Sequence, residues 1–545
     1  MSKIELYDAT LRDGMGGAGM SLTAQEKVRV VGRLDELGVD LIEAGFPASN
    51  PKELELFGIL AEQRLRHATI VAFGMTRRRG VRAGADNGLA ILADSFAPAC
   101  TLVGKSSTLH VEKVVRASRS ENLAMIADSV AFLVGRGKRV LFDAEHFFDG
   151  FVLDSAYALQ TLAAAIDAGA ERVVLCDTNG GSLPGHIGRT VEAVRQALPH
   201  APLGIHTHND SGCAVANTLV AVEAGATHVQ GTVNGIGERT GNANLITIIA
   251  DLQLKMGHRV LSAKRLARLT DTARFVDEML NRAPDPAQPY VGRHAFAHKA
   301  GMHASGVRAH PATFEHISPQ VVGNDTDLLI SELSGRAAVA EKAAAAGIAF
   351  PAGADGERLI KRVLASVKEL EHQGFQFEGA DASFELLLRK QAGQYEPLFR
   401  LESWRVLVEQ NAEGHVDTEA TIKLWHDDRR YVRTAEGNGP VNALDRALRE
   451  AIAEFYPQLA AIELVDYKVR LLETSHGTGA VTRVHIDSED GHATWGTTGV
   501  GENVVAASWQ ALVDALEYPL QPRNGKSPRR AKRGSDGTRR ARTAR

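Results

Sequence analysis

The chain has 545 residues, of which 44% are hydrophobic and 23% are charged, and its formal net charge is −4. These values are typical of a globular protein of three or four structural units, and they exclude a fibrous or wholly disordered chain. Because the three cysteines are widely spaced and neither a signal-peptide pattern nor an apolar run of about 18 residues occurs, we expect a reducing cytoplasm, no disulfide framework and no membrane span.

From residue 3 to about 275, short β-rich runs alternate with longer amphipathic stretches such as Ala24–Leu37 and Ala214–Ala224. The runs recur at roughly the length of one βα unit, and several helical stretches end at glycine, as helix C-caps do. Eight such units predict a closed (β/α)8 TIM barrel over residues 1–278, with an open doubly wound sheet as the alternative. The predicted strands are Ile4–Tyr7, Leu41–Ala44, Ile70–Phe73, Cys100–Val103, Val140–Phe142, Val173–Cys176, Leu203–His206 and Val229–Val233.

The most informative motif follows the seventh predicted strand. Side chains alternate along a strand, so His206 and His208 project from the same face. Two imidazoles on one face can chelate a divalent metal, and Asp13 would supply a carboxylate while leaving positions for a substrate. In a closed barrel the eighth strand lies beside the first and the seventh, so these residues converge at the C-terminal rim, where Asn242 would add an amide oxygen. The alternative is a pair of core histidines satisfied by hydrogen bonds.

The second half of the chain changes character twice. Residues 279–400 contain five prolines between positions 284 and 319 and then an amphipathic piece at Val363–Leu370, which predicts a linker and a helical subdomain. Residues 401–522 predict a separate α+β domain with a ββα recurrence. Its expected elements are strands Arg405–Glu409 and Ala420–Trp425, helix Pro440–Phe455, strands Ile462–Glu473 and Ala480–Ile486, and helix Val504–Glu517.

A basic tail closes the chain. Residues 523–545 hold ten Lys or Arg against one Asp, which leaves the rest of the chain with a net charge of −4 − 9 = −13. The tail has no hydrophobic periodicity, so we expect a disordered, solvated extension, with weak attachment to nucleic acid or a membrane surface as the alternative.

Several motifs together carry a family resemblance. Tyr7–Gly14, His206–Asp210 and Gly237–Asn242 resemble the α-isopropylmalate synthase/homocitrate synthase family. Within it, the chain is most similar to the branch that uses pyruvate and forms (R)-citramalate, and the similarity extends over about residues 3–520. The further stretches that carry it are Leu34–Asp40, Cys176–Gly181, Phe296–His303 and Ala435–Ala443.

The resemblance implies a Claisen-type condensation. Acetyl-CoA loses a methyl proton, its enolate attacks the ketone of a 2-oxo acid, and hydrolysis of the thioester releases CoA. A divalent metal would bind the 2-oxo acid, with Mn²⁺ or Mg²⁺ expected and Zn²⁺ as the alternative. Arg12 would place a permanent cation near the developing charge, its alternative role being a structural ion pair.

Three more residues receive roles from the resemblance. Glu145 would do acid/base or substrate-orienting work, and Thr178 would hydrogen-bond the substrate carboxylate. His303 would reach into the partner subunit's active site and transfer a proton, with His298 as the competing candidate. We expect Glu238 and Asn209 to orient the metal ligands.

The chain departs from the family at three positions, where Gly16, Ala18 and Phe314 replace the Gln, Glu and Tyr that are common there. These departures bear on which 2-oxo acid is used. Pyruvate would require a small pocket closed by Phe46, Phe73 or Phe147. The alternatives are 2-isopropylmalate or homocitrate synthase, then a metal-dependent carbon–carbon lyase or carboxyltransferase, and last a non-catalytic metal-binding or scaffold protein.

The resemblance also implies that the C-terminal domain regulates the enzyme and forms a homodimer. Besides a second copy of the chain, we expect small-molecule partners, namely a 2-oxo acid and acetyl-CoA. Isoleucine is the first candidate effector, and we expect neither a membrane nor a nucleic acid as a partner of the catalytic body.

Overall fold

The computed structural model describes residues 3–298, 301–328, 336–472 and 479–521. The chain divides into two compact units. The first is Met1–Phe296 with Glu315–Asp327, and the second is Ala297–Phe314 with Leu328–Arg545. None of the helices in these described ranges has the length and apolar character to cross a membrane. The basic tail predicted at 523–545 lies outside the described residues.

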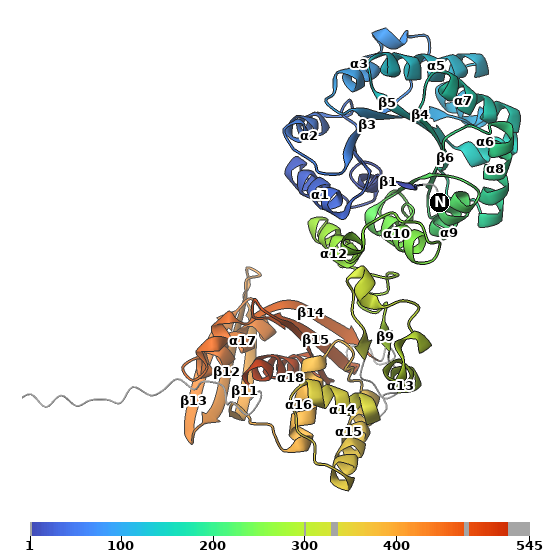
Figure 1. Cartoon of the computed structure of the whole chain (residues 1–545). Coiled ribbons are helices and arrows are strands. Elements are labelled where there is room, and N and C mark those ends of the chain that lie inside the picture. The colour runs from blue at the N-terminus through green and yellow to red at the C-terminus, as the bar shows by residue number, and fades with distance from the viewer. Residues whose placement is uncertain (1–2, 299–300, 329–335, 473–478, 522–545) are drawn as a thin grey trace, which may run out of the picture. The chain divides into compact units, whose positions relative to one another are not determined.

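Eight parallel strands form a closed barrel in the first unit, in the order of the sequence (Figure 1). Strand β1 pairs with β2 on one side and β8 on the other, which is the closure that the sequence predicted. The alternative prediction of an open doubly wound sheet is therefore wrong. The strands are β1 (Glu5–Asp8), β2 (Leu41–Gly45), β3 (Thr69–Met75), β4 (Ala99–Lys105), β5 (Arg139–Glu145), β6 (Arg172–Asp177), β7 (Leu203–Thr207) and β8 (His228–Gly231).

Helices cover the outside of this barrel. Helix α1 (Ala24–Leu37) has the bounds that the sequence predicted, because Thr23 and Glu26 form a capping box at its start and Gly38, at φ 100°, ends it. The others in this unit are α2 (Pro51–Ala61), α3 (Asn87–Asp94), α4 (Thr108–His110), α5 (Arg119–Gly135), α6 (Phe147–Leu153), α7 (Ser155–Asp167), α8 (Pro184–Ala197), α9 (Ala214–Glu223), α10 (Leu245–Leu254), α11 (Ala263–Leu266) and α12 (Leu269–Met279).

Strand β8 ends two residues earlier than the predicted Val233, and strand β7 ends one residue later than the predicted His206. Strand β8 stops at Gly231, and Val233 begins a 3-10 turn in which Asn234 has a left-handed φ of 59°. Strand β7 stops at Thr207, so His208 lies just beyond it and forms an isolated β-bridge with Asn242. This bridge brings the loops that follow β7 and β8 together at the rim.

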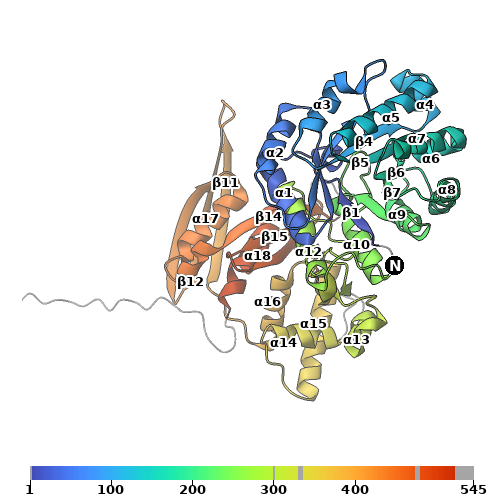
Figure 2. The same cartoon turned by 45° about the horizontal axis from the view of Figure 1, so that its top comes forward.

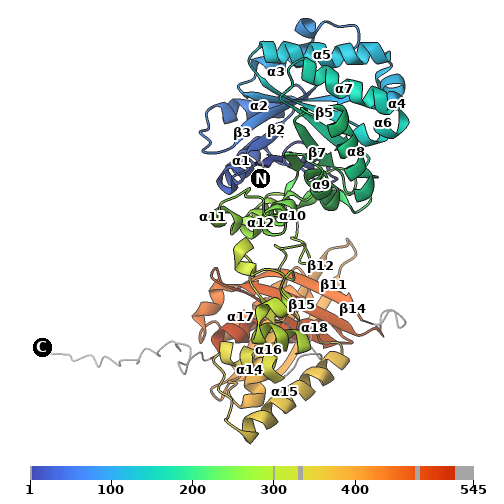
Figure 3. The same ribbon diagram turned by 45° about the vertical axis from the view of Figure 1, so that its right-hand side comes forward.

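The second unit begins with a short strand and continues with helices. Helix α13 (Gly301–Ala309) precedes α14 (Arg336–Ala345), α15 (Ala354–His372) and α16 (Asp381–Ala392). Helices α14, α15 and α16 pack on one another (Figure 3), and Val339, Val363 and Leu388 are buried between them. The short strands β9 (Ala297–His298) and β10 (Asp327–Leu328) complete this part of the chain.

The C-terminal domain contains two βββα repeats, not the ββα repeats predicted. In each, one helix packs on a three-stranded antiparallel sheet (Figure 2). The missed strands carry weak signals, because four of the nine residues of β13 are charged and β16 is rich in Gly and Thr. The elements are β11 (Arg400–Gln410), β12 (Val416–His426), β13 (Arg429–Gly437) and α17 (Pro440–Ile452), then β14 (Glu463–Leu471), β15 (Thr482–Glu489), β16 (Thr494–Gly501) and α18 (Val504–Glu517). Glu473, the end predicted for one strand, lies outside the described residues.

Candidate metal centre and active site

Three side chains from opposite ends of the barrel sequence meet at its C-terminal rim. Atoms of Asp13, His206 and His208 all lie within 4.8 Å of one another. The Nε2 atoms of His206 and His208 are 3.2 Å apart. The Asp13 Oδ2 lies 3.2 Å from the His206 Nε2 and 3.8 Å from the His208 Nε2. Neighbouring ligands of one ion are separated by about 3–3.5 Å when each metal–ligand bond is about 2.1 Å. The three residues therefore fit a single divalent metal.

The electrostatics of the cluster suit a cation. Burial alone would raise the pKa of Asp13, but the Arg12 guanidinium and the two imidazoles outweigh it and hold that pKa well below its ordinary value. Burial, followed by the neighbouring His206, lowers the pKa of His208 to about 4. Asp13 is thus an anion and His208 a neutral ligand at neutral pH.

Asn242 adds a fourth candidate ligand atom. Its side chain is buried and its Nδ2 donates to the Ile236 carbonyl, whereas its Oδ1 is buried without a hydrogen-bond partner among the described residues. A Cβ on residue 237 would lie 2.2 Å from the Asn242 Nδ2, so only glycine at this position lets the Asn242 amide pack against the backbone there. An orphaned buried acceptor opposite His208 agrees with the predicted amide ligand.

Buried polar groups that the sequence analysis missed hold His206 in place. The Gln230 Oε1 lies 2.8 Å from the His206 Nδ1, and the Gln230 Nε2 donates to Asp143. Burial raises the pKa of Asp143 to about 7. The amide oxygen fixes the proton on Nδ1 and leaves the Nε2 lone pair for the metal, as outer partners of metal-bound histidines do. The available signals were Asp143 beside the apolar run of β5 and Gln230 beside Val229 on β8.

Arg12 is held by another residue that the sequence analysis missed, Glu43 on β2. The Arg12 Nε donates to the fully buried Glu43 carboxylate at 2.7 Å, and the Tyr7 hydroxyl donates to the other Glu43 oxygen at 2.7 Å. The Arg12 Nη1 lies 3.3 Å from Asp13, and its Cζ lies 3.9 Å from the Phe73 ring centroid. Arg12 is thus an ion-paired residue that also borders the metal cluster, so both of its expected roles have a structural basis.

Glu145 and Thr178 lie at the ends of neighbouring strands. Glu145 is half-buried at the end of β5 and forms an ion pair with Lys105 of β4. The Thr178 hydroxyl accepts a hydrogen bond from the His146 backbone N–H at 2.8 Å, which leaves its own hydrogen to donate. Both positions are at the catalytic rim of the barrel.

The two candidate proton carriers belong to the second unit. His303 is an exposed residue of α13, and its ring stacks on Phe314 with centroids 4.2 Å apart. His298 is buried, and its ring meets the edge of Phe314 at 6.5 Å. Phe314, where the family usually has Tyr, therefore contacts both histidines through an apolar ring. The role of His303 stays a prediction.

The residues expected to support the ligands behave differently. The Asn209 backbone N–H donates to the Gly241 carbonyl and its Oδ1 accepts from Ala214, so it fastens the His208 loop to the Asn242 loop. Glu238, by contrast, is exposed at the tip of the β8 loop and pairs with Arg239 at 3.6 Å. The Asn242 backbone N–H donates to the Gly235 carbonyl and so joins the two ends of this loop, which leaves Glu238 pointing outward.

Two of the three candidate pocket phenylalanines lie near the cluster. The rings of Phe46 and Phe73 meet edge to face with centroids 5.7 Å apart, and the Arg12 guanidinium lies over the Phe73 ring. Phe147 is fully buried in the barrel–helix core with Phe148 and Phe151. Gly16 is exposed, and a Cβ there would meet Glu238 only at 3.8 Å, so a larger residue would fit.

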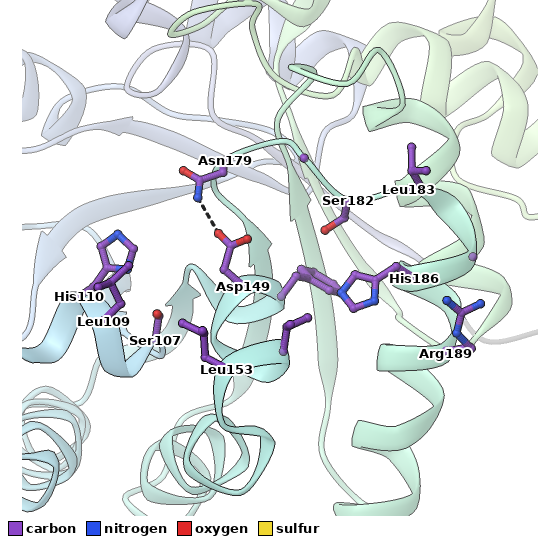
Figure 4. A pocket seen from close by; sticks show the side chains of 14 residues that line it. Ser107, Leu109, His110, Asp149, Leu153, Asn179, Ser182, Leu183, His186 and Arg189 are labelled. Carbon is purple, nitrogen blue, oxygen red and sulfur yellow. Dashed lines mark hydrogen bonds between the residues drawn. The ribbon is translucent and has the colours of Figure 1, made fainter.

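Two of the cavities on the described part of the first unit border loops at the C-terminal ends of its strands. The larger, of about 850 Å³, lies among the loops after β4, β5 and β6. In Figure 4 the Asn179 amide donates to Asp149 at 2.6 Å, with His110 on one side and His186 and Arg189 on the other. The His110 ring stacks on that of His146, next to Glu145, at 3.6 Å. The second cavity, of about 570 Å³, is lined by residues at the ends of β3 and β4.

Family models match almost the whole described chain. Residues 3–276 match the HMGL-like family, residues 290–374 match the homocitrate synthase post-HMGL domain-like family, and residues 378–520 match the LeuA allosteric (dimerisation) domain. With a closed barrel and, at its rim, three side chains whose spacing fits one divalent metal, the chain is a member of the HMGL-like class of enzymes.

Comparison with curated proteins is more specific. The chain is 50% identical over 517 residues to an (R)-citramalate synthase of Streptomyces coelicolor, which covers 94% of this chain and 96% of that protein. It is 47% identical over 527 residues to one of Synechocystis sp., covering 95% and 96%. A probable 2-isopropylmalate synthase of Methanopyrus kandleri is 32% identical over 515 residues, covering 94% and 97%. The chain belongs to the (R)-citramalate synthase family.

Proposed function

We propose that the protein is an (R)-citramalate synthase, which condenses acetyl-CoA with pyruvate and water to give (R)-citramalate and CoA. The observation that carries the proposal is the meeting of Asp13, His206 and His208 beside Arg12, in a chain 42–50% identical to five proteins of that name. The free acid and free CoA require one water per turnover.

A divalent ion held by Asp13, His206, His208 and the Asn242 amide would polarise the keto group and stabilise the charge that forms on its oxygen. Two nitrogen and two oxygen donors suit Mn²⁺ or Mg²⁺, with Zn²⁺ as the alternative. Arg12, held by Glu43 and in contact with Asp13, supports this role because it adds a permanent cation that needs no reorientation during the reaction.

The remaining roles follow the geometry of the rim. Glu145, paired with Lys105, would orient the substrate or accept a proton, and the Thr178 hydroxyl would donate to the substrate carboxylate. His303 would transfer a proton at the acetyl group. Phe46 and Phe73 would limit the space beside the keto carbon to a methyl group.

The C-terminal domain supports an assembly and a regulatory role. Because residues 378–520 match a LeuA allosteric (dimerisation) domain, we infer a homodimer in which His303 serves the partner subunit's site. Isoleucine is the proposed effector, since the product lies on a route to that amino acid. A cytoplasmic location is consistent with these soluble substrates.

The proposal is tested by following thiol release from acetyl-CoA against a panel of 2-oxo acids. Pyruvate should give the highest kcat/KM, and prior removal of metal by a chelator should abolish release until a divalent ion is restored. A preference for 2-oxoisovalerate or 2-oxoglutarate would indicate 2-isopropylmalate or homocitrate synthase. Cleavage of an acyl-CoA without any 2-oxo acid would indicate a lyase.

A further inference from the structure

A continuous series of polar side chains leads through the barrel interior to the metal cluster. The Glu5 Oε2 lies 2.9 Å from the His228 Nδ1, and the His228 Nε2 lies 3.4 Å from the Gln230 Nε2. The Gln230 Oε1 lies 2.8 Å from the Nδ1 of His206, whose Nε2 faces Asp13. We call Glu5, His228, Gln230 and His206 the interior hydrogen-bond network. It connects the face of the barrel where β1 and β8 begin with the rim that carries the cluster.

The two middle members of this network lie inside the barrel. His228 and Gln230 are two residues apart on β8, so their side chains project from the same face, and both are fully buried. Gln230 reaches Asp143 on β5, a strand that is not a neighbour of β8, so this contact crosses the interior. A Cβ on residue 204 of β7 would lie 2.8 Å from the His228 ring, so Gly204 leaves room for that ring. Buried polar groups of this kind need partners within the protein.

Charged groups fix the far end of the network. The Arg172 Nε donates to the Glu5 Oε2 at 2.7 Å, and the Arg139 Nη2 lies 3.6 Å from the Glu5 Oε1. Burial would raise the pKa of Glu5, but His228 and Arg172 outweigh burial and lower this pKa to about 2. Glu5 is therefore an anion that only accepts hydrogen bonds, and the His228 Nδ1 carries a proton.

The direction of the remaining hydrogen bonds follows from that end. Burial lowers the pKa of His228, so its ring is neutral and its Nε2 accepts. The part of the Gln230 amide that faces this nitrogen is therefore the NH2 group, which also donates to Asp143 at 3.1 Å. The amide oxygen is thereby turned towards His206. The His206 Nδ1 then carries the proton, and its Nε2 keeps a lone pair for an ion.

The opposite orientation of the Gln230 amide would disable the site. Its oxygen would face two acceptors, the His228 Nε2 and the Asp143 Oδ1, and its NH2 group would face His206. His206 would then accept at Nδ1 and carry its proton on Nε2, where the proton would exclude an ion. The His208 Nδ1, by contrast, is buried without a hydrogen-bond partner in the described ranges. Of the two histidines, His206 is thus the one whose proton position the fold sets.

We propose that His228 is a positioning residue for the metal ligand His206, and that it acts by fixing the orientation of the Gln230 amide. The inference rests on the proposed function and its metal site. His228 contacts Glu5, Gln230 and the edge of Tyr7, none of which is a proposed ligand. Its influence on the ion therefore passes through the amide.

The test replaces His228 by two amides that stand in for different ring nitrogens. In His228→Asn the short side chain places its amide near the former Nδ1, so the contact with Glu5 is kept and the contact with Gln230 is lost. In His228→Gln the longer side chain places its oxygen near the former Nε2, so Gln230 keeps an acceptor. Both variants lose the ring and its packing, so a purely structural effect would be similar in the two.

The affinity of the full chain for Mn²⁺ is measured without substrates, by competition with a chelator. Gln230→Met, which keeps the length and removes the amide, should weaken binding by about 10–100-fold. His228→Asn should weaken it by about 3–10-fold, a smaller effect because Asp143 still holds the amide. His228→Gln should stay within about twofold of wild type, and His228→Asn should have no further effect in the Gln230→Met background.

Equal affinities of wild type and His228→Asn would overturn the inference, as would equal losses in His228→Asn and His228→Gln. A second measurement needs no variant of His228. In the metal-free wild-type chain labelled with ¹⁵N at histidine, the His206 ring, assigned by its absence from His206→Asn, should carry its proton on Nδ1. A proton on Nε2 would refute the positioning role.

Failure of the inference and failure of the proposed function are distinguishable. If the variants change Mn²⁺ affinity as expected but no 2-oxo acid supports thiol release, the proposed function fails and the role of His228 stands. If pyruvate supports thiol release but His228→Asn binds Mn²⁺ as tightly as wild type, the role of His228 fails and the proposed function stands. A wild-type chain that binds no divalent ion would refute both.

Discussion

Removal of the Glu43 carboxylate should inactivate the enzyme by releasing Arg12. In the folded chain Glu43 is fully buried, and it accepts one hydrogen bond from the Arg12 Nε and one from the Tyr7 hydroxyl, each of 2.7 Å. Tyr7 keeps a second hydrogen-bond partner, Thr101 at 2.8 Å, whereas Arg12 keeps a looser ion pair with Asp13 at 3.3 Å and its contact with the Phe73 ring. The Glu43→Ala change therefore affects Arg12 most.

The expected magnitudes follow from burial. Loss of one member of a buried ion pair destabilises a fold by about 3–5 kcal/mol. A displacement of about 1 Å in a catalytic group lowers turnover by about 10²-fold. Glu43→Gln keeps the shape and one acceptor for Arg12, so it should cost only about 1–2 kcal/mol and lower kcat/KM less.

A double-mutant cycle on kcat/KM for pyruvate tests this reasoning. If Glu43 acts only by holding Arg12, then Glu43→Ala should have almost no further effect in an Arg12→Ala background. Circular dichroism and metal content should first show that each variant is folded and loaded. Losses that multiply in the double variant would refute the positioning role.

Three further predictions concern other parts of the molecule. Asn242→Ala should weaken metal binding by about 10–100-fold in a chelator-competition titration, and an unchanged affinity would remove Asn242 from the ligands. His303→Ala should lower kcat by about 10²–10⁴-fold with metal content unchanged, whereas a near-normal rate would exclude it from proton transfer. Burial raises the pKa of Glu5, but His228 and Arg172 outweigh burial and lower this pKa from 4.5 to about 2. The ionised carboxylate therefore stabilises the barrel above pH 4.5, and this contribution disappears as the pH falls towards 2. Glu5→Gln should therefore lower the unfolding temperature at pH 7 but not near pH 2, and a difference that persists at pH 2 would contradict this assignment.

The C-terminal domain shows where sequence patterns are weak. Strand β15 alternates buried and half-buried residues, as does most of β12, and both strands were found, whereas β13 and β16 were missed. In β13 the residues Arg429, Arg430 and Arg433 are exposed, and the hairpin before it turns at Asp427 and Asp428, both with positive φ. Such a strand is held by backbone pairing to β12, and it has too few apolar residues to be predicted from the sequence pattern.

The amino-acid sequence alone determined the barrel, the helix α1 between its capping residues, and the meeting of Asp13, His206 and His208 at one rim. It could do so because strand and helix periods are local, and because closure of eight units forces the first strand against the eighth. Only the tertiary structure decided which buried polar groups serve that site. Glu43 reaches Arg12 across 31 residues, and Gln230 joins His206 to Asp143 across the barrel interior. The contacts of a buried carboxylate or amide depend on the register between neighbouring strands, and that register is set by the packing of the whole barrel rather than by any one segment.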